Sequence, residues 1–430
     1  MANRLITSTG SLEHRKTGGQ LSVLVLDGSS LATLAFARSL GRAGILTTIA
    51  ASSRDAPARR SRYCADFKVY PSPLDNVEDF RKWLIRTVSC SEYELLVGTT
   101  ECTIPLISEW RQCLEPHVRV PLPDPTRLRI AFDKSAVMRL ARDLNLVIPP
   151  TTFVDGWEDV EKVARENRHW PLVIKPHSSI ACKDGRRFAV SVQYAFNADM
   201  LRRIYCHLCE QTPWPMLQNY VPGTGVGCFF LINKGNVLAR FQHQRIRDTN
   251  PTGSGSSLRV STLGDPSLMD ASERLLRALG WEGLAMVEYR VDSEGTPYFM
   301  EVNPRPWGSM QLAVEAGVDF PLMWYRGVVG HTVEEVKSYH HGIACRYLAG
   351  DLTHLESVLR GPSPGWRLPY PRRLPTLVNF LKFWGRNVRY DDFATQDWRP
   401  GVYGLKNYFQ GLCERIGRKL RRTEADSKRS

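Results

Sequence analysis

The chain contains 430 residues, of which 43% are hydrophobic and 23% are charged, a balance that excludes wholesale disorder. The 57 Lys and Arg residues outnumber the 44 Asp and Glu residues and give a net charge of +13, which favours acidic partners such as nucleotides, nucleic acid, acidic sugars or an anionic membrane surface. No apolar run approaches the roughly 20 residues that a membrane-spanning helix needs.

Residues 1–20 are polar and lack the apolar segment typical of a secretion signal, so we expect them to form a flexible tail. The ten cysteines are scattered along the chain and fit reduced thiols better than a disulfide framework. These two features predict a cytoplasmic protein.

Residues 21–122 alternate between strand-like and helix-like patterns. A continuous apolar run at 21–26, apolar residues at helical spacing over 31–40 and a second apolar run at 45–50 follow one another. This order predicts a right-handed parallel unit and therefore an open α/β domain. The turn at Asp27 lacks the G-x-G-x-x-G pattern, so no dinucleotide site is predicted there.

A Pro-rich segment at 121–125 marks the next boundary, and a helix is expected to begin at Lys134. Six strand-like segments follow, at 172–175, 216–221, 228–232, 237–242, 284–291 and 298–302. This α+β texture predicts a domain over 123–330 whose central lobe spans about 150–222. Residues 331–430 have weaker periodicity and are predicted to form a C-terminal extension with a basic tail.

The last two of these strand-like segments carry acidic side chains. They flank Asp292–Gly295, whose residues favour a turn, so we expect an antiparallel hairpin. Glu301 and Asn303 share one face because side chains alternate along a strand. Glu288 joins that face if it pairs opposite Phe299 or Glu301, whereas a register one residue off places it on the reverse side. Buried carboxylates side by side repel each other, so the cluster predicts a site for Mg²⁺ or Mn²⁺ rather than a solvated hairpin face.

Lys175 ends an apolar strand, where a cation favours an anion such as phosphate, although a lysine can also extend to solvent. A polar, basic segment follows at 177–187 and is expected to be a loop. Its backbone N–H groups and the hydroxyls of Ser178 and Ser179 can hold phosphate oxygens.

An extended segment broken by Pro222 offers free backbone groups that can read the edge of an adenine, but an ordinary strand end would have the same pattern. The residues assigned to this hinge are Gln218, Tyr220, Val221 and Gly223. Downstream, Arg245 and a hydroxyl-rich loop could close over an anionic substrate or form only a linker. The residues of that loop are Gly253, Ser254, Gly255, Ser256 and Ser257.

Together these features resemble the ATP-grasp superfamily, and within it the carboxylate–amine ligases and the large chain of carbamoyl-phosphate synthetase. The resemblance covers roughly residues 20–330, and its most specific part is M-V-E-Y at 286–289 with M-E-V-N-P-R at 300–305. It implies an N-terminal open α/β domain, called the pre-ATP-grasp domain, then a two-lobed ATP-grasp fold that clamps ATP, and a C-terminal cap.

The resemblance also implies a role for each residue. The ATP phosphates would contact Lys134, Lys175, Ser178 and Ser179. The adenine would contact Gln218, Tyr220, Val221 and Gly223. The metal ligands would be Glu288, Glu301 and Asn303. The catalytic residues would be Arg305 and Lys175. The substrate would contact Arg245, Gly253, Ser254, Gly255, Ser256 and Ser257.

This sequence departs from the family pattern at two points. Where relatives have several glycines after the Lys-Pro pair, only Ser178, Ser179 and Gly185 remain. Relatives often have an acidic residue just after the hinge glycine, where this chain has Thr224.

The implied activity is Mg-dependent amide formation from a small carboxylate and a small amine through an acyl phosphate. A homodimer and no nucleic-acid partner are expected. Two alternatives stay open: an ATP-grasp kinase or nucleotide sensor without ligation, and a basic protein that binds nucleic acid or an anionic membrane. The tail carries basic residues near Arg418 and an apolar stripe, so its helix would either dock on its own domain or contact a membrane. The stripe consists of Tyr408, Leu412, Ile416 and Leu420.

Overall fold

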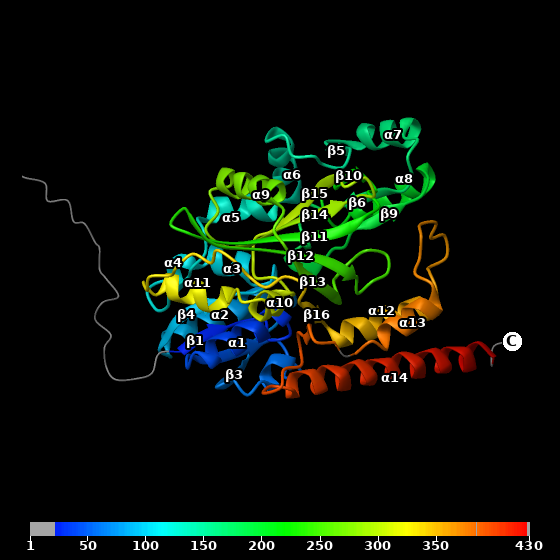
Figure 1. Ribbon diagram of the computed structural model, residues 1–430. Coiled ribbons are helices and arrows are strands. Elements are labelled where there is room, and N and C mark those ends of the chain that lie inside the picture. Colours follow the sequence, from blue (N-terminus) through cyan, green and yellow to red (C-terminus); the bar gives the residue numbers. More distant parts are fainter. Residues whose placement is uncertain (1–21, 384, 428–430) are drawn as a thin grey trace, which may run out of the picture.

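The computed structural model describes residues 22–383 and 385–427, and Figure 1 shows how their elements are arranged. A small parallel sheet and a much larger sheet form the body, a central lobe lies on the far side of the large sheet, and a long C-terminal helix runs along the base. This confirms the predicted α/β and α+β fold class. The predicted tail at 1–20 lies outside the described residues. Among the residues described, no helix is both long and apolar enough to cross a membrane.

The N-terminal sheet is parallel and has the order β3-β2-β1-β4. Its strands are β1 (Ser22–Val25), β2 (Leu46–Ala51), β3 (Asp66–Val69) and β4 (Tyr93–Val97). Helix α1 (Leu31–Arg42) joins β1 to β2, which confirms the predicted strand–helix–strand unit. The other helices here are η2 (Pro57–Arg60), α2 (Val77–Ser89), α3 (Ile104–Glu109) and α4 (Arg111–Leu114).

Two short helices, α5 (Pro125–Phe132) and α6 (Lys134–Asp143), connect the N-terminal sheet to the strands that follow. The Asp133 side chain accepts the N–H groups of Ser135 and Ala136 and so caps α6. The predicted helix start at Lys134 is therefore correct, and the cap fixes Lys134 in the first turn of α6.

The central lobe contains a four-stranded sheet in the order β5-β10-β6-β9. These strands are β5 (Thr151–Thr152), β6 (Leu172–Lys175), β9 (Gln193–Ala195) and β10 (Met216–Asn219). Helices α7 (Trp157–Glu166) and α8 (Ala198–Cys209) contribute to the same apolar core.

Residues 177–187 differ from the expected loop because they include most of a β-hairpin. Strands β7 (Ile180–Lys183) and β8 (Arg186–Ala189) pair with each other through a two-residue turn. Asp184 and Gly185 both have positive φ, 50° and 73°, as a tight hairpin turn requires. The backbone amides of this segment therefore serve partly in strand pairing.

The large sheet has seven strands in the order β15-β14-β11-β12-β13-β16-β17. They are β11 (Thr224–Asn233), β12 (Asn236–Arg247), β13 (Leu258–Thr262), β14 (Gly283–Val291), β15 (Pro297–Asn303), β16 (Ala344–Arg346) and β17 (Val388–Tyr390). Phe230 belongs to a core with α6 and α9 (Pro266–Ala278), whereas Phe229 belongs to a core with α1, α10 (Met310–Glu315) and α11 (Phe320–Val328). Both faces are thus covered, which explains the continuous apolar run in β11.

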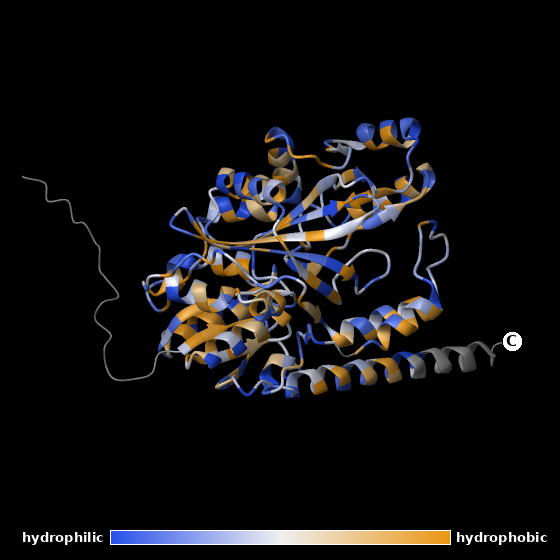
Figure 2. Cartoon of the chain, in the orientation of Figure 1, coloured by the Kyte–Doolittle hydropathy of each residue, from blue (hydrophilic) through white to orange (hydrophobic). Residues whose placement is uncertain are grey.

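The C-terminal extension adds two strands to this sheet and three helices, which are α12 (Leu348–Arg360), α13 (Arg373–Phe380) and α14 (Arg399–Ser427). On α14 the Tyr408 hydroxyl donates to the Glu356 carboxylate at 2.9 Å, and Arg415 pairs with the same carboxylate at 3.0 Å. The first part of α14 therefore docks on α12, and Figure 2 shows apolar and polar residues alternating along it. The side chains of Ile416 and Leu420, from the predicted apolar stripe, lie outside the described part.

Candidate functional site

The acidic hairpin has the register that brings its carboxylates together. Glu288 on β14 lies directly opposite Glu301 on β15, and Met286 lies opposite Asn303. Residues opposite each other in an antiparallel pair point to the same face. The conditional prediction about Glu288 is therefore confirmed: both carboxylates and the Asn303 amide share one face.

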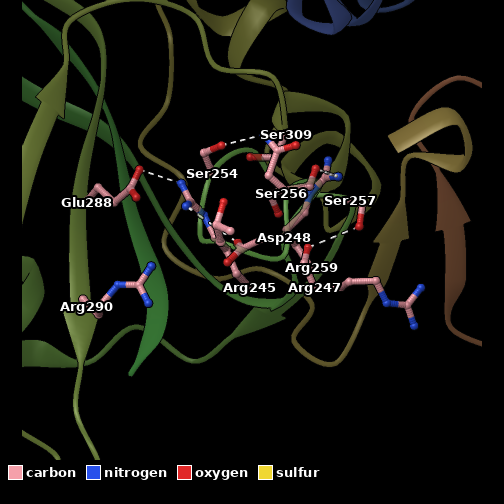
Figure 3. A network of polar contacts seen from close by, with 12 residues as sticks. Arg245, Arg247, Asp248, Ser254, Ser256, Ser257, Arg259, Glu288, Arg290 and Ser309 are labelled. Atoms are coloured by element: carbon pink, nitrogen blue, oxygen red, sulfur yellow. Dashed lines mark hydrogen bonds and ion pairs between the residues drawn. The ribbon is translucent and has the colours of Figure 1, made fainter. Parts of the chain in front are cut away.

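Three cations surround the two carboxylates. Lys134 Nζ lies 2.9 Å from Glu301 Oε2, and Lys175 Nζ lies 3.9 Å from the same oxygen. Arg245 Nη2 lies 2.6 Å from Glu288 Oε2. Figure 3 shows this pair, whose residues come from β12 and β14, the two strands on either side of β11. Lysines from α6 and β6 thus meet a hairpin more than a hundred residues further along the chain.

The charges and the burial shift the pKa values of this cluster. Burial by itself raises the pKa of Glu301, but the positive charges of Lys134 and Lys175 outweigh it and lower that pKa to about 2. Burial lowers the pKa of Lys175 to about 8, although Glu301 opposes the shift. Burial also raises the pKa of Glu288, partly offset by Arg245. The site is thus poised to take up further anionic charge next to Lys175 and Lys134.

A cavity of about 440 Å³ opens between this cluster and the central lobe. The predicted site residues that line it are Lys134, Lys175, Gln218, Tyr220, Val221, Arg245, Gly253, Ser254, Gly255, Glu288 and Glu301. Residues predicted separately for phosphate, adenine, metal and substrate therefore face one space.

The hinge contains one position where only glycine fits. Gly223 has φ +146°, and a Cβ there would lie 2.2 Å from the carbonyl oxygen of Val291. The Gly223 carbonyl accepts a hydrogen bond from Arg290 Nη1 at 2.9 Å. Gly223 thus fixes the approach of the hinge to β14, whereas Gln218, Tyr220 and Val221 line the cavity.

Ser178 and Ser179 do not line this cavity. Ser178 lines a second cavity on the other side of the segment, and the Ser179 carbonyl accepts the N–H of Val190 beside the hairpin. The hydroxyl-rich loop is also divided, because Gly253, Ser254 and Gly255 line the cavity whereas Ser256 and Ser257 do not. The Ser257 N–H donates to the Arg247 carbonyl, and the Ser256 hydroxyl is buried with no hydrogen-bond partner among the described residues.

Arg305 lies beside the carboxylates and connects them to the N-terminal domain. Its Nη2 donates to Asn303 Oδ1 at 3.1 Å, and its Nε lies 3.6 Å from Glu101 Oε1. Glu101 was missed in the sequence analysis. Its position after strand β4 could have identified it, because ligand contacts concentrate at the carboxyl edge of a parallel sheet.

Tyr194 and Arg290 also line the cavity and were missed. The Tyr194 hydroxyl donates to the Thr252 carbonyl at 3.2 Å, so it links the central lobe to the substrate loop. Tyr194 reaches the site from β9 of the central lobe, so nothing local in the sequence distinguishes it. Arg290 lies two residues after Glu288 on β14, so strand alternation is the local signal that places it on the same face.

The oxygen donors fit a divalent cation that is bound together with phosphate. Mg²⁺ uses one or two carboxylates and completes its shell with water and phosphate oxygens. Glu288, Glu301 and Asn303 supply such a set on one face. Within the described chain, no group of three His, Cys, Asp or Glu side chains could hold an ion by itself.

Residues 211–350 match the family model described as "ATP-grasp in the biosynthetic pathway with Ter operon". Three solved structures illustrate the wider similarity. The L-amino acid ligase from Bacillus licheniformis has a TM-score of 0.56 at 15% identity, with 73% of this chain and 76% of that chain covered. The N5-carboxyaminoimidazole synthetase from Staphylococcus aureus has a TM-score of 0.57 at 14% identity, with 76% and 82% covered.

The third is the biotin carboxylase domain of the 2-oxoglutarate carboxylase from Hydrogenobacter thermophilus, a dimer in complex with MgADP, ADP and bicarbonate. Its TM-score is 0.59 at 15% identity, with 76% of this chain and 74% of that chain covered. At such identities the similarity establishes the fold.

Proposed function

Starting from a chain with the ATP-grasp fold, we propose that it is an ATP-dependent ligase that joins a carboxylate to an amine through an acyl phosphate. One observation carries the proposal: Glu288 and Glu301 stand opposite each other with Lys134, Lys175 and Arg245 around them at the wall of the cavity. Phosphoryl transfer needs this combination of metal ligands and cations.

The nucleotide would lie in the cavity with its adenine at the hinge and its phosphates at the two lysines. Gln218, Tyr220 and Val221 line the hinge side, and Lys134 and Lys175 line the other. Mg²⁺ or Mn²⁺ held by Glu288, Glu301 and Asn303 would neutralise charge on the transferring phosphoryl group. The MgADP in the similar biotin carboxylase domain supports this assignment.

The proposed reaction has two steps. A carboxylate oxygen of the substrate attacks the γ-phosphorus, a new O–P bond forms, the bond to the bridging oxygen breaks, and ADP leaves. Lys134, Lys175 and Arg305 stabilise the charge that develops. An amine nitrogen then attacks the acyl carbon, the C–O bond to phosphate breaks, and the nitrogen loses its extra protons to give the amide. Arg245 and the loop 253–257 would hold the carboxylate substrate.

Replacing Glu301 tests the site. Glu301→Gln keeps the shape but removes the charge that balances Lys134 and would bind the metal, so turnover should fall at least about a hundredfold. The assay is a screen of carboxylate and amine pairs for ADP release, with mass detection of the product.

The matched control is Glu294→Gln, which changes an exposed glutamate in the turn of the same hairpin and should leave turnover unchanged. Full turnover in Glu301→Gln would refute the assignment. ADP release that needs only one acceptor and gives a stable phosphorylated product would favour a kinase instead.

The kinase or nucleotide-sensor alternative has one observation in its favour. Ser178 and Ser179 replace glycines and do not line the nucleotide cavity, so closure over the γ-phosphate would need a different hairpin position. A chain that binds ATP without releasing ADP in any substrate pair would be the sensor.

The cellular setting stays a proposal. We propose a cytoplasmic homodimer that acts on small molecules, in line with the biosynthetic pathway to which the matching family is assigned. The net positive charge also fits two alternative partners. Arg415 and Arg418, which are exposed on α14, could contact an anionic membrane, or the basic chain could bind nucleic acid.

A further inference from the structure

A second and larger cavity, of about 640 Å³, lies between the N-terminal domain and the β7–β8 hairpin. Helices α3 and α5 form one side of it, and Ile180, Ala181 and Cys182 of β7 form the other. Of the residues given a role in the sequence analysis, Ser178 alone lines this space, and the proposed reaction does not use it.

The two cavities share a wall. Asp133 lines the second cavity and the next residue, Lys134, lines the nucleotide cavity. Likewise, Lys175 lines the nucleotide cavity and His177 lines the second cavity. The two segments are joined by a hydrogen bond, in which the Lys134 N–H donates to the His177 carbonyl at 2.8 Å. A molecule in the second cavity would therefore lie beside the ATP phosphates without displacing the nucleotide.

Glu101 stands where the second cavity meets the reacting centre. It lines the cavity, and its carboxylate is 3.6 Å from Arg305 Nε. Its side chain is only 13% exposed. A carboxylate in this position can hold an ammonium group and accept its proton.

The rest of the lining has mixed charge and an apolar middle. Glu109 is acidic, whereas Arg129 and Arg187 are basic, and the Arg187 Nη1 is already engaged with the Cys102 carbonyl at 2.9 Å. The apolar part consists of Pro105, Pro125, Leu128, Phe132, Ile180 and Ala181. Such a wall suits a molecule with a cationic end, an anionic end and an apolar body.

One polar atom of the wall has no hydrogen-bond partner among the residues that the structure describes. The Ser108 hydroxyl is buried, lines the cavity and makes no hydrogen bond to any described residue. A buried hydroxyl normally finds a partner, so a polar group of a ligand is the simplest complement.

We propose that this cavity binds the acceptor amine, and that the acceptor is a small zwitterionic amine with an apolar body, such as an α-amino acid. The inference rests on the proposed ligase function. The ammonium group lies at Glu101, which takes its proton, and the free amine attacks the acyl carbon. The C–N bond forms, phosphate leaves with the electron pair of the C–O bond, and the nitrogen releases its second proton to solvent. The arginines hold the carboxylate of the acceptor.

Cys182 gives a test that does not need turnover, because it is an exposed free thiol in the wall of the cavity. The probe is L-leucine, and the readout is the rate of N-ethylmaleimide labelling at Cys182, followed by mass spectrometry. At ten times its Kd, L-leucine should slow the labelling of Cys182 about tenfold. Labelling of Cys206, an exposed thiol on α8 outside the cavity, should not change.

Two analogues separate the charges: 4-methylpentanoate lacks the amine and 3-methylbutylamine lacks the carboxylate, so both should protect much less. Glu101→Gln should weaken the protection by L-leucine about tenfold with ADP binding intact, whereas Glu115→Gln on the surface should not. No protection by L-leucine or other amino acids at millimolar concentration would overturn the inference.

The two proposals fail in distinguishable ways. Ligation of a carboxylate and an amine without protection of Cys182 would remove this acceptor site and leave the ligase function. Protection of Cys182 without any product would leave the binding site and remove the ligase function on which its role rests.

Discussion

Lys175 is a buried charged residue at the candidate site. It lies at the end of β6, donates to the Met300 carbonyl at 2.6 Å and stands 3.9 Å from Glu301. Its side chain is only 6% exposed, so desolvation outweighs the attraction of Glu301 and lowers its pKa to about 8. An arriving phosphate would favour the charged form, so nucleotide binding should be linked to protonation of Lys175.

ADP binding should therefore depend on pH. Below about pH 8 Lys175 is already charged in the free protein, whereas above that pH binding must take up a proton. The affinity for ADP should fall as pH rises above 8, by up to about tenfold for each pH unit. Calorimetry between pH 7 and 9.5 measures this change. Lys175→Arg keeps its charge and should show a flat profile, and equal slopes for both proteins would contradict the prediction.

Among the elements, the loop between α12 and α13 makes an unexpected connection to the central lobe. The Trp366 ring lies 5.4 Å from Tyr194 and 5.6 Å from Phe196, measured between ring centroids. Tyr194 lines the cavity proposed for the nucleotide, and its ring lies 6.2 Å from that of Tyr220. The C-terminal extension thus contacts the central lobe beside this cavity.

Removing this aromatic contact should loosen the lobe. Trp366→Ala should raise the Kd for ADP about tenfold, because two aromatic pairs each contribute about 0.5–1.5 kcal/mol beyond burial. Fluorescence titration with a labelled nucleotide measures the effect. Trp398→Ala is the control, since Trp398 is 54% exposed. Equal affinities in the two variants would show that the loop does not position the lobe.

For the whole molecule, the segment that follows β17 joins three distant parts of the chain. The Arg38 guanidinium on α1 is fully buried and pairs with Asp397 at 2.8 Å, and Arg259 on β13 pairs with Asp391 at 2.6 Å. Arg38 also donates to the Asp392 carbonyl. Buried charges are stable only when paired, so these contacts tie the N-terminal sheet, the large sheet and the extension together.

Asp392 makes this junction sensitive to pH. Both of its carboxylate oxygens are buried without a hydrogen-bond partner in the described chain. Burial, with the negative charge of Asp391, raises its pKa from 3.8 to about 7, and Arg38 only partly opposes the shift. Between pH 4 and 7 the folded state keeps a proton that the unfolded state has lost. This group therefore stabilises the fold less and less as pH rises through that window.

Asp392→Asn should remove this dependence. The free energy of unfolding should fall less between pH 5.5 and 8.5 than in the unmodified protein, and the variant should be the more stable of the two at pH 8.5. Urea unfolding at four pH values checks this. Asp270→Asn, at an exposed position on α9, should follow the unmodified protein. Parallel curves for all three proteins would exclude Asp392 as the source.

Sequence patterns were sufficient for the features that depend on near neighbours. The helix start at Lys134, the strand that ends at Lys175 and the acidic hairpin with Glu301 all follow from caps, turns and two-residue alternation. Even here, alternation left two registers open for Glu288, and strand pairing selected one. The hairpin at 180–189 could also have been read from its Asp-Gly turn.

Long-range packing was needed for the rest. Glu101 reaches Arg305 from another domain, Tyr194 enters the cavity from the central lobe, and Asp397 meets Arg38 across the chain. Each of these contacts joins segments that are far apart in the chain. The periodicity of a sequence indicates only on which face of its own helix or strand a residue lies. The partner on the other side depends on how the sheets and lobes stack, because that stacking buries the apolar faces together.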